Sequence, residues 1–198
     1  MSYSIISLLA LILNLILNRE TLINVKSRSS ELKTEQKFIT RYRQFLIVSN
    51  FYFIVDFGWG LLYEHHDIDA LFPILYSDCV FYFLLMFMTM LTWMRSIVAY
   101  LDKKGRRSKV LLCAVWTMFT LALIYLMINR FHPFIFSFNE KHEYVTESGR
   151  HIAFILQIIL YFVTTIYMFF IALKSKGTEK ARYRAVGLTK RCTKINAN

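Results

Sequence analysis

The chain is poor in the residues that build disulfide frameworks, metal sites and soluble active sites. Its 198 residues include two prolines, six glycines and only three cysteines. These cysteines, Cys79, Cys113 and Cys192, lack the spacing of a zinc site or a disulfide framework. No phosphate-binding GxxxxGK loop, HExxH motif or GxSxG motif occurs. We therefore predict no catalytic residues, no metal site and no cofactor.

Acidic residues are also scarce, with 13 Asp and Glu against 24 Lys and Arg. A net charge of +11 would suit a nucleic-acid partner, but the distribution of the charge argues against one. Residues 19–43, 95–109 and 174–198 hold 21 of the 24 basic residues, and long apolar runs separate these stretches. This is the positive-inside pattern of a chain that crosses a bilayer several times. The expected partner is the lipid bilayer, with no nucleic acid.

Hydrophobic residues are abundant, at 56% of the chain, and they fall into long runs. We predict an all-α, polytopic membrane protein with an N-terminus outside and a cytoplasmic C-terminus. A membrane domain would cover residues 1–173 and a basic cytoplasmic tail would cover 174–198. The five expected transmembrane helices span about residues 2–18, 45–63, 70–93, 110–128 and 152–173.

The first of these runs is the shortest, and it carries Asn14. We expect a polar group on a neighbouring helix to pair with this side chain. After this run, Leu22, Val25, Leu32 and Ile39 recur with a helical period among basic residues. The segment is either an amphipathic helix under the inner leaflet or a helical extension of both flanking spans.

Of the predicted outer loops, only the one over residues 129–150 is long enough for structure of its own. Phe134, Phe136 and Phe138 alternate with other residues. Residues 139–142 are turn-like, and residues 143–145 resume an extended pattern. We predict a short β-hairpin that rests as a lid on the outer ends of the helices.

Two carboxylates, Asp56 and Asp78, lie inside apolar runs, where an ionised side chain is costly. If their helices are antiparallel neighbours, both carboxylates lie at a similar depth below the outer surface. They would then line one ligand-binding pocket together with Trp59, Tyr76 and Tyr82. The alternative is that each carboxylate is protonated or hydrogen-bonded and only fixes helix packing.

The loop between the second and third spans is rich in acidic and imidazole groups. Such side chains bind divalent metals and, near pH 6, respond to protonation. A solvated polar loop explains them more simply, so sensing here is the weaker hypothesis. The residues concerned are Glu64, His65, His66, Asp67 and Asp69.

Five segments together resemble the N-terminal multi-helix membrane sensor region of bacterial diguanylate cyclases of the GGDEF type. They follow one another in order over nearly the whole chain. The segments are NLILNRE at 14–20, DFGWGLL at 56–62, LYSDCVFYF at 75–83, WMR at 93–95 with VAYL at 98–101, and YRAVGLT at 183–189.

The resemblance implies a sensor in the bacterial cytoplasmic (inner) membrane, a homodimer, and a link to cyclic di-GMP signalling. No GGDEF motif occurs, and after residue 189 the chain continues in polar residues where the family has further apolar helices. We therefore expect a non-catalytic signal-input region, truncated before its output domain, that responds to an unknown small-molecule signal. The alternative is a small membrane transporter or channel subunit that uses Asp56 and Asp78.

Overall fold

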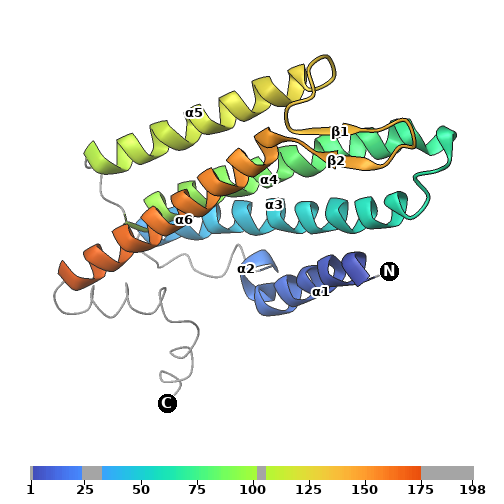
Figure 1. Ribbon diagram of the computed structural model, residues 1–198. Coiled ribbons are helices and arrows are strands. Elements are labelled where there is room, and N and C mark those ends of the chain that lie inside the picture. The colour runs from blue at the N-terminus through green and yellow to red at the C-terminus, as the bar shows by residue number, and fades with distance from the viewer. Residues whose placement is uncertain (1, 24–32, 102–105, 175–198) are drawn as a thin grey trace. The chain divides into compact units, whose positions relative to one another are not determined.

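The computed structural model describes residues 2–23, 33–101 and 106–174, which are almost entirely helical. The predicted all-α class is confirmed, with one small hairpin added (Figure 1). The chain forms two compact units, Met1–Arg150 and His151–Asn198. The elements in order are α1 (Ser2–Leu17), α2 (Arg19–Ile23), α3 (Lys33–Tyr63), the 3-10 helix η1 (Asp69–Leu71), α4 (Phe72–Leu101), α5 (Arg106–Ile128), β1 (Phe136–Phe138), β2 (Tyr144–Thr146) and α6 (Ser148–Lys174).

Four of the described helices are long and apolar enough to cross a membrane. Their apolar segments are Gln36–Tyr63, Asp69–Tyr100, Ser108–Ile128 and Ser148–Phe170, which match four of the five predicted spans. The first run is also helical, but its apolar part, Ser4–Leu17, is shorter than the roughly 20 residues that a bilayer requires. A fifth crossing and the sidedness of the ends stay predictions.

The stretch between the first two predicted spans is helical at both of its ends. The short helix α2 follows α1 almost directly, and α3 begins at Lys33, well before the predicted start of its span. This arrangement agrees with helical extension of the flanking spans. Residues 24–32, which include Val25 and Leu32 of the predicted amphipathic face, lie outside the described residues, as does the tail from residue 175.

Helix α4 forms the centre of the first unit, with α3 and α5 packed on it and α1 packed on α3 (Figure 1). One stripe of α4, at intervals of three and four residues, is buried over most of its length. This stripe contains Leu75, Cys79, Phe83, Met86, Met90 and Met94. Side chains on α1 and α5 remain exposed although most are apolar, as expected for surfaces that face lipid.

A ladder of polar contacts joins α1 to α3. Residue numbers fall along α1 as they rise along α3, so the two helices are antiparallel. The hydrogen bonds run from Tyr42 Oη to Asn18 Oδ1 (3.3 Å), from Asn14 Nδ2 to Asn50 Oδ1 (2.8 Å) and from Ser7 Oγ to Asp56 Oδ2. The expectation that a neighbouring helix pairs with Asn14 is thus confirmed. Interhelical hydrogen bonds of this kind hold helices together where lipid removes the hydrophobic drive.

The second unit holds α6 from His151 onward. Its hydroxyl groups bond the backbone of their own helix: Thr164 donates to the Leu160 carbonyl (2.6 Å) and Thr165 to the Tyr161 carbonyl (2.9 Å). Such bonds satisfy a hydroxyl without a second helix, which makes threonine acceptable in an apolar span.

Candidate functional site

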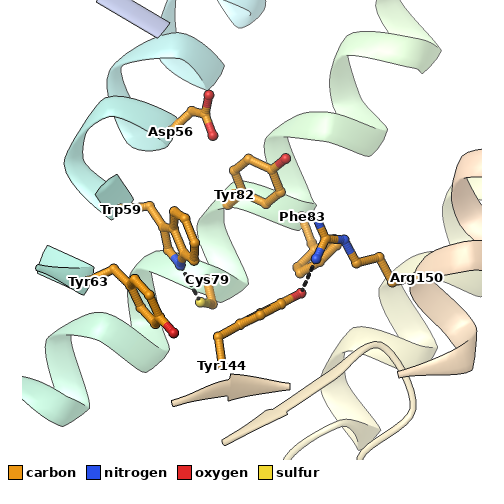
Figure 2. Close-up of a pocket in the computed structure, with 8 residues that line it drawn as sticks. All are labelled: Asp56, Trp59, Tyr63, Cys79, Tyr82, Phe83, Tyr144 and Arg150. Carbon is orange, nitrogen blue, oxygen red and sulfur yellow. Dashed lines mark hydrogen bonds between the residues drawn. The ribbon is translucent and has the colours of Figure 1, made fainter. Parts of the chain in front are cut away.

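A cavity of about 340 Å³ lies between α3, α4, β2 and the first turn of α6 (Figure 2). All of its walls belong to the first unit. The volume falls at the lower end of the range for small-molecule sites, ~300–1,000 Å³. Most of the lining is aromatic, with one carboxylate, one thiol and one guanidinium group: Asp56, Trp59, Tyr63, Cys79, Tyr82, Phe83, Tyr144 and Arg150.

Trp59 forms the wall on α3. Its indole stacks on Tyr63, one helical turn later, with ring centroids 5.0 Å apart, and meets Tyr144 edge-on at 5.8 Å. The indole N–H donates to Cys79 Sγ on α4 at 3.1 Å, drawn as a dashed line in Figure 2. These contacts fix the ring orientation, so the cavity wall is preformed.

Asp56 and Tyr82 form the part of the cavity that is remote from the hairpin. Asp56 is buried and accepts a hydrogen bond from Ser7 on α1. Tyr82 is buried too, and its hydroxyl receives a hydrogen bond from Tyr52 Oη at 3.1 Å. A charge-bearing group therefore lies next to an aromatic ring, in surroundings that exclude most water.

The hairpin, residues 136–146, covers the other side of the cavity. Its strands pair antiparallel, with Phe136 opposite Thr146 and Phe138 opposite Tyr144, so the predicted strands do form a hairpin. Phe136 is fully buried and stacks on Phe83 of α4 at 5.5 Å. The hairpin therefore rests on α4 through aromatic contacts. These contacts stabilise it, because two strands alone are only marginally stable.

Asn129 fastens the start of the hairpin loop to the end of α5. Its side chain is 2% exposed. Its Oδ1 accepts hydrogen bonds from the backbone N–H groups of Phe134 (2.9 Å) and Ile135 (2.8 Å), and its Nδ2 donates to the Phe136 carbonyl (2.8 Å). One amide thus satisfies three backbone groups in a buried place.

Gly149 allows the end of the loop to close tightly. Its N–H donates to the Phe134 carbonyl at 2.8 Å, and a Cβ at this position would lie 2.4 Å from that oxygen. A side chain does not fit there. The close approach places the next residue, Arg150, over the hairpin.

Arg150 and Tyr144 form the charged end of the cavity. The Arg150 NH1 donates to Tyr144 Oη (3.2 Å) and to Thr146 Oγ1 (2.9 Å). Its guanidinium also lies 5.3 Å from the centroid of the Tyr144 ring, a cation–π contact. Burial raises the pKa of the Tyr144 phenol, and the positive charge of Arg150 opposes this shift.

The tip of the hairpin contacts the loop between α3 and α4. His142 takes a left-handed backbone conformation, with φ of 57°, and its ring stacks on Phe72 at 4.3 Å. Its Nδ1 lies 3.6 Å from Asp69 Oδ1. Aromatic stacking and this polar contact together hold the tip against α4.

The predicted site residues fall into two groups. Asp56, Trp59 and Tyr82 line the cavity. Tyr76 does not; it packs under the hairpin on Phe136, with ring centroids 5.3 Å apart.

Asp78 does not line the cavity either. A Cβ on Gly58 would lie 3.7 Å from Asp78 Oδ1, so this carboxylate faces α3 near Gly58. Its Oδ2 is buried and has no hydrogen-bond partner among the described residues.

Five cavity residues escaped the sequence prediction: Tyr63, Cys79, Phe83, Tyr144 and Arg150. Cys79 and Phe83 follow Leu75 at intervals of four, so the buried stripe of α4 is the signal that could have found them. Tyr144 of the hairpin and Arg150 of α6 carry no such signal, because the prediction placed a lid without fixing which helix it covers.

The polar loop between α3 and α4 forms no metal site. Among residues 2–23, 33–101 and 106–174, no group of three His, Cys, Asp or Glu could hold an ion. The two adjacent imidazoles instead approach backbone carbonyls: His65 Nδ1 lies 3.2 Å from the Leu61 oxygen and His66 Nδ1 2.9 Å from the Tyr63 oxygen. Glu64 and Asp67 do not line the cavity.

Comparison of this chain with protein-family models, with curated proteins and with solved structures finds no match. The geometry of the cavity and its lid is therefore the basis for assigning a function.

Proposed function

We propose that this chain is the non-catalytic signal-input region of a membrane sensor, whose signal is a small molecule bound in the cavity beneath the hairpin. One observation supports this function best. The cavity of about 340 Å³ has helical walls on one side and a small hairpin lid on the other. Sensors need a site whose two halves can change their contacts when a ligand arrives.

The lid and the walls differ in how firmly they are held. Trp59 and Cys79 belong to α3 and α4, the two longest helices among the described residues, and bond each other across them. Tyr144 belongs to a strand of three residues whose partner strand is equally short. A ligand that touches both would favour the closed lid, and this preference is what a sensor converts into a signal.

The proposed setting is the bacterial cytoplasmic membrane, with the hairpin outside the cell and the basic segments inside. The charge distribution of the sequence supports this orientation, since basic residues concentrate on the cytoplasmic side of membrane proteins. The resemblance to sensor regions of diguanylate cyclases adds a homodimer and a role in cyclic di-GMP signalling to the proposal.

A second candidate is a small transporter or channel subunit. The observation in its favour is Asp78, whose buried Oδ2 has no hydrogen-bond partner in the described part of the chain. Buried carboxylates of this kind mark proton or cation pathways in membrane proteins. Against it, α1, α5 and α6 contain no glycine or proline within their apolar segments apart from Gly149 near the start of α6, so broken helices are not evident.

The proposal can be tested with a substitution that fills the cavity. The full chain is reconstituted in lipid nanodiscs and a library of small molecules is screened by thermal unfolding. We expect at least one compound to raise the Tm of the wild type, since a ligand that binds only the folded state stabilises it. Cys79→Phe should abolish this rise, because Cys79 lines the cavity.

The matched control is Cys113→Phe, the same change at an exposed cysteine of α5. It should leave the ligand-induced rise intact. Circular dichroism without ligand establishes that both variants are folded. A ligand response that survives in Cys79→Phe, or no response to any compound, would contradict the sensor function. Proton or cation flux in proteoliposomes that is lost in Asp78→Asn would favour the transporter instead.

A further inference from the structure

We infer that the cavity binds an uncharged aromatic molecule of one or two rings. The inference rests on the proposed function and names the chemical class of the signal. Three features of the cavity support it: the rings that line it, the bonds that its two charged side chains already form within the protein, and its location among apolar helix segments.

Aromatic side chains make up most of the cavity lining. They come from α3, α4 and the hairpin strand β2, so they face the space from more than one side (Figure 2). A flat aromatic ligand can contact several of them at once in offset or edge-on geometry, and such contacts are favourable beyond the area that they bury. The rings are those of Trp59, Tyr63, Tyr82, Phe83 and Tyr144.

The rings on the two helices are held in place by contacts with one another and with Cys79. Trp59 donates its indole N–H to the Cys79 sulfur and stacks on Tyr63 at 5.0 Å. Tyr82 meets Phe83 edge-on, with ring centroids 5.2 Å apart. A ligand that matches this preformed surface binds without much ordering of the protein, which lowers the cost of binding.

The two charged side chains of the lining already have partners within the protein. Asp56 accepts a hydrogen bond from Ser7. Arg150 donates to Tyr144 Oη and to Thr146 Oγ1. A cation in the cavity would be repelled by Arg150, and an anion by Asp56. An uncharged ligand meets neither repulsion and requires no new ion pair.

The helical part of the lining lies within segments that are apolar enough to cross a membrane. Asp56, Trp59 and Tyr63 belong to the segment Gln36–Tyr63, and the lining residues of α4 belong to Asp69–Tyr100. An ion loses far more hydration than a neutral molecule when it leaves water for such surroundings. The location therefore favours the same class of ligand as the charges do. A volume of about 340 Å³ suits a molecule with one or two rings.

A set of matched probes separates charge from aromatic character. Phenylacetamide is aromatic and uncharged, phenylacetate is its isosteric anion, phenethylamine is a cation and phenylalanine is a zwitterion. Cyclohexylacetamide keeps the uncharged amide and replaces the aromatic ring with a saturated one. Trp59 serves as the reporter in the full chain in nanodiscs, after Trp93→Phe and Trp116→Phe remove the other two tryptophans. None of the probes contains an indole, so the change in tryptophan fluorescence arises from the protein.

We expect phenylacetamide to bind at least about tenfold more tightly than phenylacetate, phenethylamine or phenylalanine, because each of these brings charge into the cavity. It should bind at least about threefold more tightly than cyclohexylacetamide, as expected for one favourable ring contact. Cys79→Phe, which fills the cavity, should abolish the fluorescence change, whereas the same substitution at the exposed Cys113 should preserve it.

A second reporter distinguishes binding in the cavity from uptake of the probe into lipid. Trp116 lies on α5, is 47% exposed and does not line the cavity. With Trp116 as the sole tryptophan, after Trp59→Phe and Trp93→Phe, phenylacetamide should produce no saturable change in fluorescence. An equal response from both reporters would overturn the inference. This comparison stands even if Cys79→Phe fails to fold.

Tightest binding of phenylacetate would identify an anion site, of phenethylamine a cation site and of phenylalanine a zwitterion site. Equal binding of phenylacetamide and cyclohexylacetamide would show that the rings do not select the ligand. Each of these results, and a failure of all the probes to bind, overturns the inference while leaving a small-molecule sensor in place. The sensor function itself fails only when the screen described above finds no compound whose effect depends on Cys79.

Discussion

The hairpin should depend on the single buried amide of Asn129, and removing that amide should release the lid. Asn129→Ala leaves the N–H groups of Phe134 and Ile135 and the carbonyl of Phe136 without their present partner. A buried backbone group without a partner costs about 1–3 kcal/mol, so three such groups amount to roughly 3–6 kcal/mol after partial rescue by water. At about 1.4 kcal/mol per factor of ten, lid opening should increase more than a hundredfold.

The chain supplies a matched control in Asn139 at the hairpin turn. This amide also accepts two backbone hydrogen bonds, from Lys141 (3.0 Å) and Glu143 (2.9 Å), but its side chain is exposed. Water can replace those bonds, so Asn139→Ala should cost only ~1 kcal/mol. The two substitutions remove the same side-chain amide, which is buried at residue 129 and exposed at residue 139.

Hydrogen–deuterium exchange measured by mass spectrometry distinguishes the two in nanodiscs. Peptides that cover the hairpin should exchange much faster in Asn129→Ala and only slightly faster in Asn139→Ala, while peptides from the middle of α4 should not change in either variant. Equal exchange in both variants would show that burial does not govern the strength of this attachment. Faster exchange throughout α4 would show instead that the hairpin and the helices unfold together.

Two further substitutions test the packing around the site. Gly60→Ala should separate α1 from α3 and lower the Tm, because its Cβ would lie 2.9 Å from Ser4 Cβ; Gly58→Ala, where the nearest atom is 3.7 Å away, should be neutral or slightly stabilising. Phe136→Ala should lower the free energy of unfolding by about 3–5 kcal/mol, as expected for a fully buried ring, whereas Phe131→Ala, at a ring 80% exposed, should have little effect. Thermal denaturation in detergent measures both pairs, and equal losses within either pair would contradict the packing described here.

The sequence was sufficient for the helices and for the lid because both depend on local patterns. Apolar runs of about 20 residues predict helices whatever surrounds them, since the bilayer leaves the backbone no other partner. The alternation around Phe136 predicts a strand in the same local way. The structure starts β2 at Tyr144, one residue later than the prediction. Strand ends are least well determined by such patterns because side-chain contacts decide them.

The predicted grouping of Asp56 with Asp78 shows what sequence patterns cannot determine. Counting residues from the helix ends gives the depth of a side chain, and Gly58 confirms that Asp78 lies near α3 at the level of Asp56. Counting does not give the rotation of a helix about its axis. In a soluble helix the apolar stripe reveals that rotation, but in lipid both the packed face and the outer face are apolar. Of the two carboxylates, only Asp56 lines the cavity.

Asp56 belongs both to the hydrogen-bond ladder between α1 and α3 and to the lining of the cavity. It therefore connects the cavity to the rest of the first unit. Its carboxylate accepts the bond from Ser7 that belongs to the α1–α3 ladder, and it also lines the cavity below the hairpin. A carboxylate has about four lone-pair sites, so a polar group of a ligand bound in the cavity and the serine hydroxyl would share or compete for the same two oxygens. Binding at Asp56 must then alter the strength of the bond to α1. If the chain is a sensor, the ladder between α1 and α3 is thus the first part of the helical bundle to respond to the ligand.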